Sequence, residues 1–569
     1  MNQIIERILS KKVYCFLLIL SAVIIIYSIG LTSYLFADDF MFIEKAKNTD
    51  WSNWQSIVHS WVFTARDSGL WWVPKDTVAQ FLRPLIAFSF AIDYSLWGMN
   101  PFGFHLLNLL VHIFTSIIVF FIIDFISQNR RVSLLGSLLF TIHPCQAEAV
   151  FWVSGRCDLI CGFFYFTSFF CFIKYRQADK KIWLIGSLIT FILSLSAKEM
   201  TITLPLVMII YDMALNKEKH LKTYIPFFGL LVVYLLIRFA VFGNVCKMPD
   251  TYFYSLAQPE FIYCLIRNLF SYLTGLVLGL SPMIVIPFLG KPKIVLYLIF
   301  LIVLLLILLI FRSLKGRRDF RFSYLWILIS LLPVLIILPF ERYLYIPSLG
   351  FSIIAALFIL KITSSPGFKK VGIGLLIILL IGYSSFNIIK GARYKLGSST
   401  VEKVVKDVKK YYPTLPDNSH LYFINLSPLA CLSTSQGFRL EYNNPTISAY
   451  VLTMSPNFGP GCDSYLKVIN KHILLIGLNK GSFLDNPVAQ FFLLGRSFTK
   501  GEKIEWDGFN ATMTKMDNLW PTEILFEFKE EIASPDSYFF EFKDWRVYPL
   551  FKKKVMSTGS EHKAIIKGE

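Results

Sequence analysis

From its start to about residue 395, the chain alternates between long apolar stretches and short polar or basic segments. A hydrocarbon layer about 30 Å thick requires roughly 20 residues of apolar helix, because lipid offers no hydrogen-bond partner to an open backbone group. The pattern therefore predicts a polytopic α-helical membrane domain over residues 1–394. The stretches that predict membrane-spanning helices are the eleven at residues 13–36, 102–127, 132–144, 157–175, 182–197, 200–215, 223–243, 294–311, 322–340, 344–361 and 371–390.

One further apolar segment, residues 261–289, is interrupted by an Arg and two Pro residues. If it crossed the membrane once, the basic loops at 312–321 and 361–370 would lie outside, against the usual excess of Lys and Arg on the inner side. We therefore interpret it as a re-entrant or interfacial hairpin in an outer loop that covers residues 244–293. The first outer loop is predicted at residues 38–101.

Basic residues are concentrated in six short loops, which hold 20 Lys or Arg and which are cytoplasmic if the N-terminus is. The first span follows a basic start without a convincing cleavage site, so we expect it to remain as a signal anchor. The other helix ends and the C-terminal segment are then extracytoplasmic. We expect an integral protein of a bacterial cytoplasmic membrane, with these parts on the periplasmic side. The basic loops are residues 1–12, 128–131, 174–181, 216–222, 312–321 and 361–370.

From about residue 395 the apolar runs shorten and alternate with polar residues, as in 421–426 and 524–528. This pattern predicts an extracytoplasmic β-rich domain over residues 395–569. It is interpreted either as a sandwich that binds an acceptor or a partner protein, or as a structural lid. Two cysteines, Cys431 and Cys462, either form a disulfide there or remain separate thiols. Its aromatic residues either stack on sugar rings or pack in the core; they are Trp506, Trp520, Phe539, Phe540 and Trp545.

The composition excludes an ordinary soluble protein, since 55% of the 569 residues are hydrophobic and only 17% are charged. A net charge of +18 could indicate nucleic-acid binding. Most of the basic surplus, however, lies in short loops between apolar spans, which is typical of membrane topology, so no nucleic-acid partner is expected. The nine cysteines show neither the density of a disulfide scaffold nor the pairing of zinc ligands.

Ionisable side chains gather at the outer ends of the predicted helices. Charged groups at membrane depth are costly and usually face a protein interior or a wet cavity, so their position on one side predicts a single site. The alternative for each residue is that helix ends commonly carry charge. Arg238 is isolated in an apolar span and is interpreted as a snorkelling side chain. The gathered residues are Asp38, Asp39, Arg83, Asp93, His105, His143, Glu148, Arg156, Asp158, Lys198, Glu199, Glu341 and Arg342.

Asp38 and Asp39 directly follow the first span. Two adjacent carboxylates repel, so one of them can keep a raised pKa and act as a general base. The alternative is an acidic start of the next short helix, where the helix dipole favours Asp. From these residues alone, both interpretations stand.

Four cations, Arg83, Arg156, Lys198 and Arg342, lie on the outer side in this topology. Guanidinium groups match phosphate geometry, and Lys supplies a compact point charge. Together they predict a site for a lipid-linked phosphate at the headgroup level. The alternative is plain ion pairing with neighbouring acids.

These residues belong to short runs that strongly resemble the membrane half of the transmembrane and tetratricopeptide-repeat O-mannosyltransferases, a family of the GT-C superfamily of polyprenyl-phosphate-sugar-dependent glycosyltransferases. The resemblance covers about residues 30–395. After residue 395 the chain departs from the family, because a β-rich segment replaces the repeats. The runs are Phe36-Ala-Asp-Asp-Phe40, Arg83-Pro-Leu85, Asp93-Tyr-Ser-Leu-Trp-Gly-Met-Asn-Pro101, Phe104-His105, His143-Pro-Cys-Gln-Ala-Glu-Ala-Val150, Gly155-Arg-Cys-Asp158, Ala197-Lys-Glu199 and Glu341-Arg-Tyr-Leu-Tyr-Ile-Pro-Ser-Leu-Gly350.

The resemblance implies transfer of mannose or another hexose from a polyprenyl-phosphate donor to an extracytoplasmic glycan, lipid or protein, usually with inversion. It implies that Asp38 is the base and that Asp39 orients the acceptor or contacts a metal. The four cations would bind the donor phosphate. Some members use a divalent cation and others do not, and no metal ligands are predicted here. The residues predicted to line the substrate cavity are Asp93, His105, His143, Glu148, Asp158, Glu199, Glu341 and Tyr343.

Two other classes of function fit a polytopic membrane protein. A transporter or flippase commonly shows repeated halves and binding charges at the midplane. This chain shows no internal duplication, and its charges gather at one surface. A ligase or polymerase that uses a lipid-diphosphate donor is also outward-facing and Arg-dependent, but the Asp pair directly after the first span does not support it.

Overall fold

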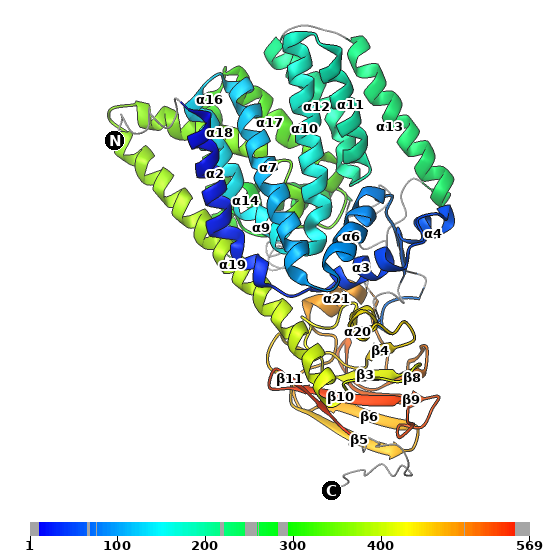
Figure 1. Cartoon of the computed structure of the whole chain (residues 1–569). Coiled ribbons are helices and arrows are strands. Elements are labelled where there is room, and N and C mark those ends of the chain that lie inside the picture. Colours follow the sequence, from blue (N-terminus) through cyan, green and yellow to red (C-terminus); the bar gives the residue numbers. More distant parts are fainter. Residues whose placement is uncertain are drawn as a thin grey trace. The chain divides into compact units, whose positions relative to one another are not determined.

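The computed structural model describes residues 11–64, 69–75, 77–216, 221–244, 259, 261–282, 294–493 and 496–551 (Figure 1). The chain divides into two compact units. We call residues Met1–Ser33 and Gln80–Lys395 the helical unit, and residues Tyr34–Ala79 and Leu396–Glu569 the mixed unit.

The helical unit consists of long apolar helices joined by short turns. Local signals mark several helix starts: the side chain of Asn100 accepts a hydrogen bond from the Phe102 N–H, and that of Asn129 accepts from the Arg131 N–H. Its helices are α2 (Lys12–Tyr27), α6 (Pro84–Trp97), α7 (Pro101–Ser127), α8 (Arg130–Ile142), α9 (Ala147–Phe151), α10 (Arg156–Ala178), α11 (Lys181–Leu195), α12 (Leu204–Tyr211), α13 (Leu221–Phe242), α14 (Phe261–Leu278), α16 (Ile294–Leu314), α17 (Arg318–Leu331), α18 (Ser348–Ser364) and the first part of α19 (Lys369–Tyr411).

Several short helical turns connect these helices, and two of them hold Glu199 and Arg342. They are η1 (Ser28–Thr32), η2 (Pro144–Gln146), η3 (Val153–Gly155), η4 (Glu199–Thr203), η6 (Leu332–Val334), η7 (Glu341–Leu344) and the π-helical turn η5 (Asp212–Asn216).

Among the described residues, seven helices are long and apolar enough to cross a membrane. The pair Arg130–Ile142 and Pro144–Phe151, bent by 47°, makes an eighth if it counts as one span. This confirms a polytopic helical membrane protein. Four shorter apolar helices accompany these spans, namely Pro84–Trp97, Lys181–Leu195, Leu298–Leu314 and Ser348–Ser364.

Three segments differ in detail from the predicted helices. The segment predicted as a span at 322–340 is helical only to Val334, because α17 ends at Leu331 and η6 follows. Helix α19 continues to Tyr411, well past the predicted span at 371–390. In the segment 261–289, the described part forms one apolar helix, α14, and residues 283–289 lie outside the described residues.

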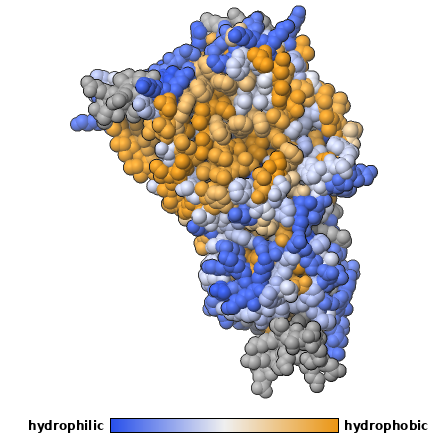
Figure 2. All heavy atoms as spheres, viewed as in Figure 1, coloured by the Kyte–Doolittle hydropathy of each residue, from blue (hydrophilic) through white to orange (hydrophobic). Residues whose placement is uncertain are grey.

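The surface of the helical unit suits a lipid environment. Figure 2 shows hydrophobic side chains over most of the drawn face of these helices. Ile25 on α2, Phe114 on α7 and Ile378 on α19 are 73%, 54% and 68% exposed. Apolar side chains this exposed over several neighbouring helices are expected where lipid rather than water surrounds the protein.

The C-terminal part of the mixed unit is rich in strands, as predicted. In the described residues, one sheet has the order β11-β10-β3-β4, with β3 parallel to both neighbours, and a second, antiparallel sheet has the order β5-β6-β9-β8-β7. The strands are β3 (His420–Ile424), β4 (Ser448–Val451), β5 (Ser464–Asn470), β6 (Ile473–Leu478), β7 (Lys503–Glu505), β8 (Phe509–Asp517), β9 (Trp520–Phe528), β10 (Ser537–Lys543) and β11 (Arg546–Pro549), with helices α20 (Thr434–Tyr442) and α21 (Pro487–Leu493) between them.

Alternation along β3 explains how its two faces are covered. The ring of Tyr422 meets Phe528 of the second sheet at 5.0 Å, whereas the ring of Phe423 stacks on Phe438 of α20 at 5.3 Å. The sheet therefore packs on the second sheet with one face and on α20 with the other.

The structure distinguishes some of the alternatives for the aromatic residues and the two cysteines of the C-terminal domain. Trp506, Phe539 and Phe540 are buried and belong to the core, whereas Trp520 and Trp545 are partly exposed. Cys431 and Cys462 are separate thiols.

The mixed unit also contains the segment Tyr34–Ala79, which follows the first span. It forms α3 (Asp39–Asn48), α4 (Trp54–His59) and the strands β1 (Val62–Thr64) and β2 (Val78–Gln80), which pair with each other.

Candidate active site

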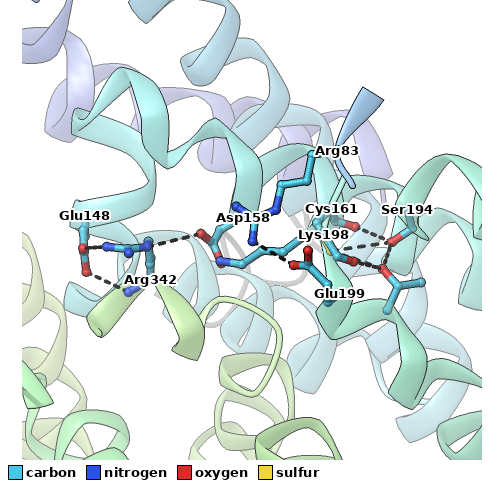
Figure 3. A network of polar contacts seen from close by, with 9 residues as sticks. Arg83, Glu148, Asp158, Cys161, Ser194, Lys198, Glu199 and Arg342 are labelled. Carbon is cyan, nitrogen blue, oxygen red and sulfur yellow. Dashed lines mark hydrogen bonds and ion pairs between the residues drawn. The ribbon is translucent and has the colours of Figure 1, made fainter. Parts of the chain in front are cut away.

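Two groups of ion pairs in the helical unit form a network of side chains from six separate segments. The groups are joined where Lys198 of one and Glu199 of the other are neighbours in the sequence, and Figure 3 labels every member except Arg238. Positive and negative side chains alternate along each group, so that each carboxylate lies between two cations or between a cation and a backbone N–H. The members of the network are Arg83, Glu148, Asp158, Lys198, Glu199, Arg238 and Arg342.

Asp158 stands at the centre of this network. It lies in the first turn of α10, where the helix dipole stabilises a carboxylate. One oxygen is 2.6 Å from Lys198 Nζ and the other is 3.7 Å from Arg342 Nε. Its side chain is 3% exposed, so its charge is offset by these two cations rather than by bulk water.

Glu148 holds Arg342 from the other side (Figure 3). One carboxylate oxygen accepts the Arg342 backbone N–H at 2.9 Å, and the second pairs with the guanidinium. The guanidinium also lies 4.1 Å from the ring centre of Phe340 and 5.2 Å from that of Trp152. Backbone and side chain of Arg342 are thereby fixed together, which pre-organises the cation.

At the far end, Glu199 lies between two arginines. Arg83 donates to one oxygen at 2.7 Å, and Arg238 lies 3.3 Å from the other. Arg238 also donates to the Gln80 carbonyl at 2.9 Å. The interpretation of Arg238 as an isolated snorkelling residue is wrong, since its side chain is only 4% exposed and paired. The signal that marks it is a lone ionisable residue inside an apolar span.

Small polar groups fix the backbone that carries Lys198. Thr201 Oγ1 donates to the Lys198 carbonyl at 3.0 Å, and Ser194 Oγ lies 2.6 Å from Thr201 Oγ1. Cys161 Sγ is 3.3 Å from Thr201 Oγ1. Lys198 Nζ is also 4.4 Å from the centre of the Tyr343 ring. Cys161 therefore packs beneath the site, and Tyr343 lies beside its Lys.

The network carries four cations against three carboxylates, so it has a surplus of one positive charge. Its ends remain partly open to solvent, with the side chains of Glu199, Arg342 and Arg83 exposed by 29%, 17% and 13%. A partly open, pre-organised site with this surplus suits an anion of one negative charge, such as a phosphodiester.

The turn that presents Glu148 and Asp158 depends on Gly155. A Cβ at this position would lie 2.7 Å from the Glu148 carbonyl oxygen and 2.8 Å from that of Ala149, both backbone atoms. We expect Gly155→Ala to destabilise the protein by about 1–3 kcal/mol, because the backbone must shift to relieve the clash. Thermal unfolding of the purified protein tests this. Gly374, with nothing within 4 Å of such a Cβ, is the control, and an unchanged melting temperature for Gly155→Ala would contradict the prediction.

Arg156 and Asp93 form a separate buried pair. Arg156 NH1 is 2.7 Å from Asp93 Oδ2, and the guanidinium lies 4.2 Å from the ring centre of Phe90. The side chain of Arg156 is fully buried. His105, on α7, is also buried. These positions favour a structural role for Arg156 over contact with a donor phosphate.

His143 and Glu341 are engaged elsewhere in the helical unit. The Cys145 N–H donates to His143 Nδ1, so Nε2 carries the hydrogen that it donates to the Leu276 carbonyl at 2.8 Å. Glu341 pairs with Lys390 of α19 at 2.7 Å. Burial raises the pKa of the Glu341 carboxyl to about 7, although Lys390 acts in the opposite direction. Both residues thus support the segments around Arg342 rather than extend the network.

Asp38 and Asp39 lie in the mixed unit, at the start of α3. Asp39 is buried, and its Oδ2 accepts the Phe36 N–H at 2.9 Å, whereas Asp38 is partly exposed. Between them and Phe36, Ala37 has φ of +52°, a left-handed conformation that costs a non-glycine residue about 1–2 kcal/mol. The two carboxylates therefore differ, since the second closes the turn and the first borders solvent.

Within the residues that the structure describes, no group of three or more His, Cys, Asp or Glu side chains is arranged to hold a metal ion.

Comparison with known proteins matches part of the helical unit. Residues 82–242 match the model of the dolichyl-phosphate-mannose-protein mannosyltransferase family. Human protein O-mannosyl-transferase TMTC4 is 33% identical over 150 residues, which is 23% of this chain and 20% of TMTC4. Human TMTC3 is 31% identical over 133 residues, or 23% of this chain and 14% of TMTC3. The chain thus spans a fifth or less of the length of these relatives.

Two solved structures overlap loosely with the chain. ArnT from Cupriavidus metallidurans, solved bound to undecaprenyl phosphate, is 11% identical, with a TM-score of 0.40 over 76% of this chain and 85% of ArnT. An Archaeoglobus fulgidus oligosaccharyltransferase is 9% identical, with a TM-score of 0.36 over 76% of this chain and 64% of that enzyme. Likenesses this weak carry no inference about function.

The family match coincides with the charged network, because every network residue except Arg342 lies within 82–242. The resemblance predicted from the motifs is confirmed in this part of the chain, which is similar to the dolichyl-phosphate-mannose-protein mannosyltransferase family and to the protein O-mannosyl-transferases TMTC4 and TMTC3.

Proposed function

We propose that this protein is a membrane glycosyltransferase that moves a hexose, such as mannose, from a polyprenyl-phosphate donor to an acceptor hydroxyl on the extracytoplasmic side of a bacterial membrane. The observation that carries the proposal is the coincidence between the network and the matched segment. Residues 82–242 hold six of the seven network residues, and the family matched there is named for a lipid-phosphate mannose donor.

The donor phosphate is assigned to the exposed side of the network. A sugar linked to a polyprenyl phosphate is a phosphodiester with one negative charge, which equals the network's surplus. When the bond between the sugar C1 and the phosphate oxygen breaks, the leaving lipid phosphate gains a further negative charge. Arg342, Lys198 and Arg83 are fixed before the reaction, so they stabilise that charge without reorganising.

The general base is assigned to Asp38. It takes the proton of the acceptor hydroxyl while the hydroxyl oxygen attacks C1 and the electron pair of the broken bond leaves with the phosphate. Attack opposite the leaving group inverts the anomeric centre. The partial exposure of Asp38 supports this assignment, whereas the buried Asp39, bonded to the Phe36 N–H, holds the turn and orients its neighbour.

A mass-spectrometric comparison of surface glycans, lipids and glycoproteins from cells with and without the gene tests the function. We expect one hexose to disappear from one class of acceptor without the gene and to return with the wild-type chain. The lost mass names the sugar and its acceptor together. Unchanged acceptors, together with an altered distribution of a lipid-linked sugar between the two leaflets, would contradict the proposal and indicate a flippase.

A further inference from the structure

The segment that carries the Asp38 turn folds with the C-terminal domain. Residues Tyr34–Ala79 and Leu396–Glu569 form one compact unit, although more than 300 residues separate them in the chain. Trp71 is buried in this unit, where its Nε1–H donates to the Leu452 carbonyl at 2.9 Å and its ring meets that of Phe526 at 5.8 Å. The C-terminal domain therefore contains the proposed base segment as part of its own structure.

A bidentate ion pair joins helix α20 to α3, the segment that follows the Asp38 turn. Arg439 Nε is 2.6 Å from one oxygen of Glu44 on α3, and its NH2 donates to the other at 3.2 Å. Their side chains are 26% and 15% exposed, so water screens this pair only in part. Bidentate pairs of this kind fix orientation as well as distance.

The same helix holds the segment before the turn. The Tyr34 hydroxyl donates to one oxygen of Glu441, whose other oxygen accepts from Lys409 Nζ at 2.6 Å. The Tyr34 N–H donates to Ser398 Oγ at 3.2 Å. Burial, followed by the negative charge of Glu441, raises the pKa of the Tyr34 hydroxyl well above its ordinary value, so Tyr34 stays a donor at physiological pH.

The turn between these two anchors is under strain. Ala37 holds a left-handed conformation, and Phe40, two residues after Asp38, packs against Gly437 of α20. Strained backbone persists only where surrounding contacts over-determine it. Here the contacts of Tyr34, Phe40 and Glu44 with α20 lie on both sides of Asp38 in the sequence.

We propose that α20 is a positioning element for the Asp38 turn, and that Arg439 and Glu441 are its positioning residues. The inference rests on the proposed function of Asp38 as the base. It gives the C-terminal domain a defined part in sugar transfer.

Charge reversal across the Glu44–Arg439 pair tests the inference in the full-length protein. We expect Glu44→Arg and Arg439→Glu each to lower kcat at least tenfold with polyprenyl-phosphate mannose as the probe donor, and to leave KM for that donor within about twofold. The double variant E44R/R439E restores the pair with reversed sense, and we expect it to recover most of kcat. In hydrogen-exchange mass spectrometry, the single variants increase exchange in residues 36–48 and the double variant reverses the increase.

The matched control is Lys503→Glu, which breaks the exposed pair between Lys503 and Glu527 in the same unit. It should change neither kcat nor exchange in residues 36–48. Unchanged exchange or unchanged kcat in both single variants would overturn the positioning role. A wild-type chain that transfers no sugar, but whose exchange responds as expected, would instead overturn the proposed function and leave the anchoring of the turn standing.

Discussion

Replacing Asp38 by Asn is expected to lower the rate of sugar transfer by about 10²–10⁴-fold, the range that a positioned general base contributes. The amide keeps the size of the side chain but cannot accept the acceptor's proton. Asp39→Asn is expected to retain more activity, because an amide oxygen can still accept the Phe36 N–H that Asp39 binds. Initial rates with polyprenyl-phosphate mannose and a membrane fraction as the acceptor source measure both effects.

Asp50→Asn is the matched control for Asp38. It makes the same change at an exposed Asp of the same segment, whose carboxylate accepts from Ser52. We expect this variant to transfer sugar at the wild-type rate. Wild-type turnover in Asp38→Asn, with normal amounts of the protein in the membrane, would exclude Asp38 as the base.

Arg342→Ala is expected to lower kcat/KM for the lipid-linked donor by about 10²–10³-fold, because it removes a fixed cation from the side where the phosphate charge develops. Its removal also leaves Glu148 without its guanidinium partner. The double variant R342A/E148Q relieves that uncompensated charge, and we expect it to restore protein yield but not donor use. Arg342→Lys keeps the charge and loses the planar fork, so an intermediate loss is expected.

Arg317→Ala serves as the control for Arg342. Its side chain is 52% exposed and pairs with Asp319 near the start of α17. The variant should retain the wild-type kcat/KM for the donor. If Arg342→Ala and R342A/E148Q both kept the wild-type dependence on donor concentration, Arg342 would not bind the phosphate.

Much of the helical unit is predictable because lipid imposes one strict rule on the backbone. A stretch of apolar residues long enough to cross the membrane must form a helix, so α7, α10 and α13 begin and end within three residues of their predicted bounds. The same rule does not predict where a helix stops inside an apolar stretch. Val334 and the residues after it are as apolar as those of α17, yet α17 ends at Leu331.

The sequence predicts which types of residue form the candidate site. It predicts only in part which of these side chains form ion pairs with each other. Asp158, Lys198 and Arg342 were predicted on one side, and the structure joins them. Arg238, which was predicted to stand alone, belongs to the network, whereas Arg156 is buried and pairs with Asp93. Which cation meets which carboxylate depends on how helices distant in sequence pack, and hydropathy carries no information about that packing.

By itself, the sequence determined the apolar helices, the strand-rich character of the C-terminal domain and the family resemblance, because each of these depends on short-range periodicity or on local motifs. Only the tertiary structure decided that the Asp38 segment folds with the C-terminal domain. That assignment rests on contacts such as Glu44 with Arg439 and Trp71 with Leu452, which join parts of the chain nearly 400 residues apart. The partner of a charged side chain or of a buried indole is the group that the fold brings close to it. The local pattern of polar and apolar residues therefore cannot predict which group that is.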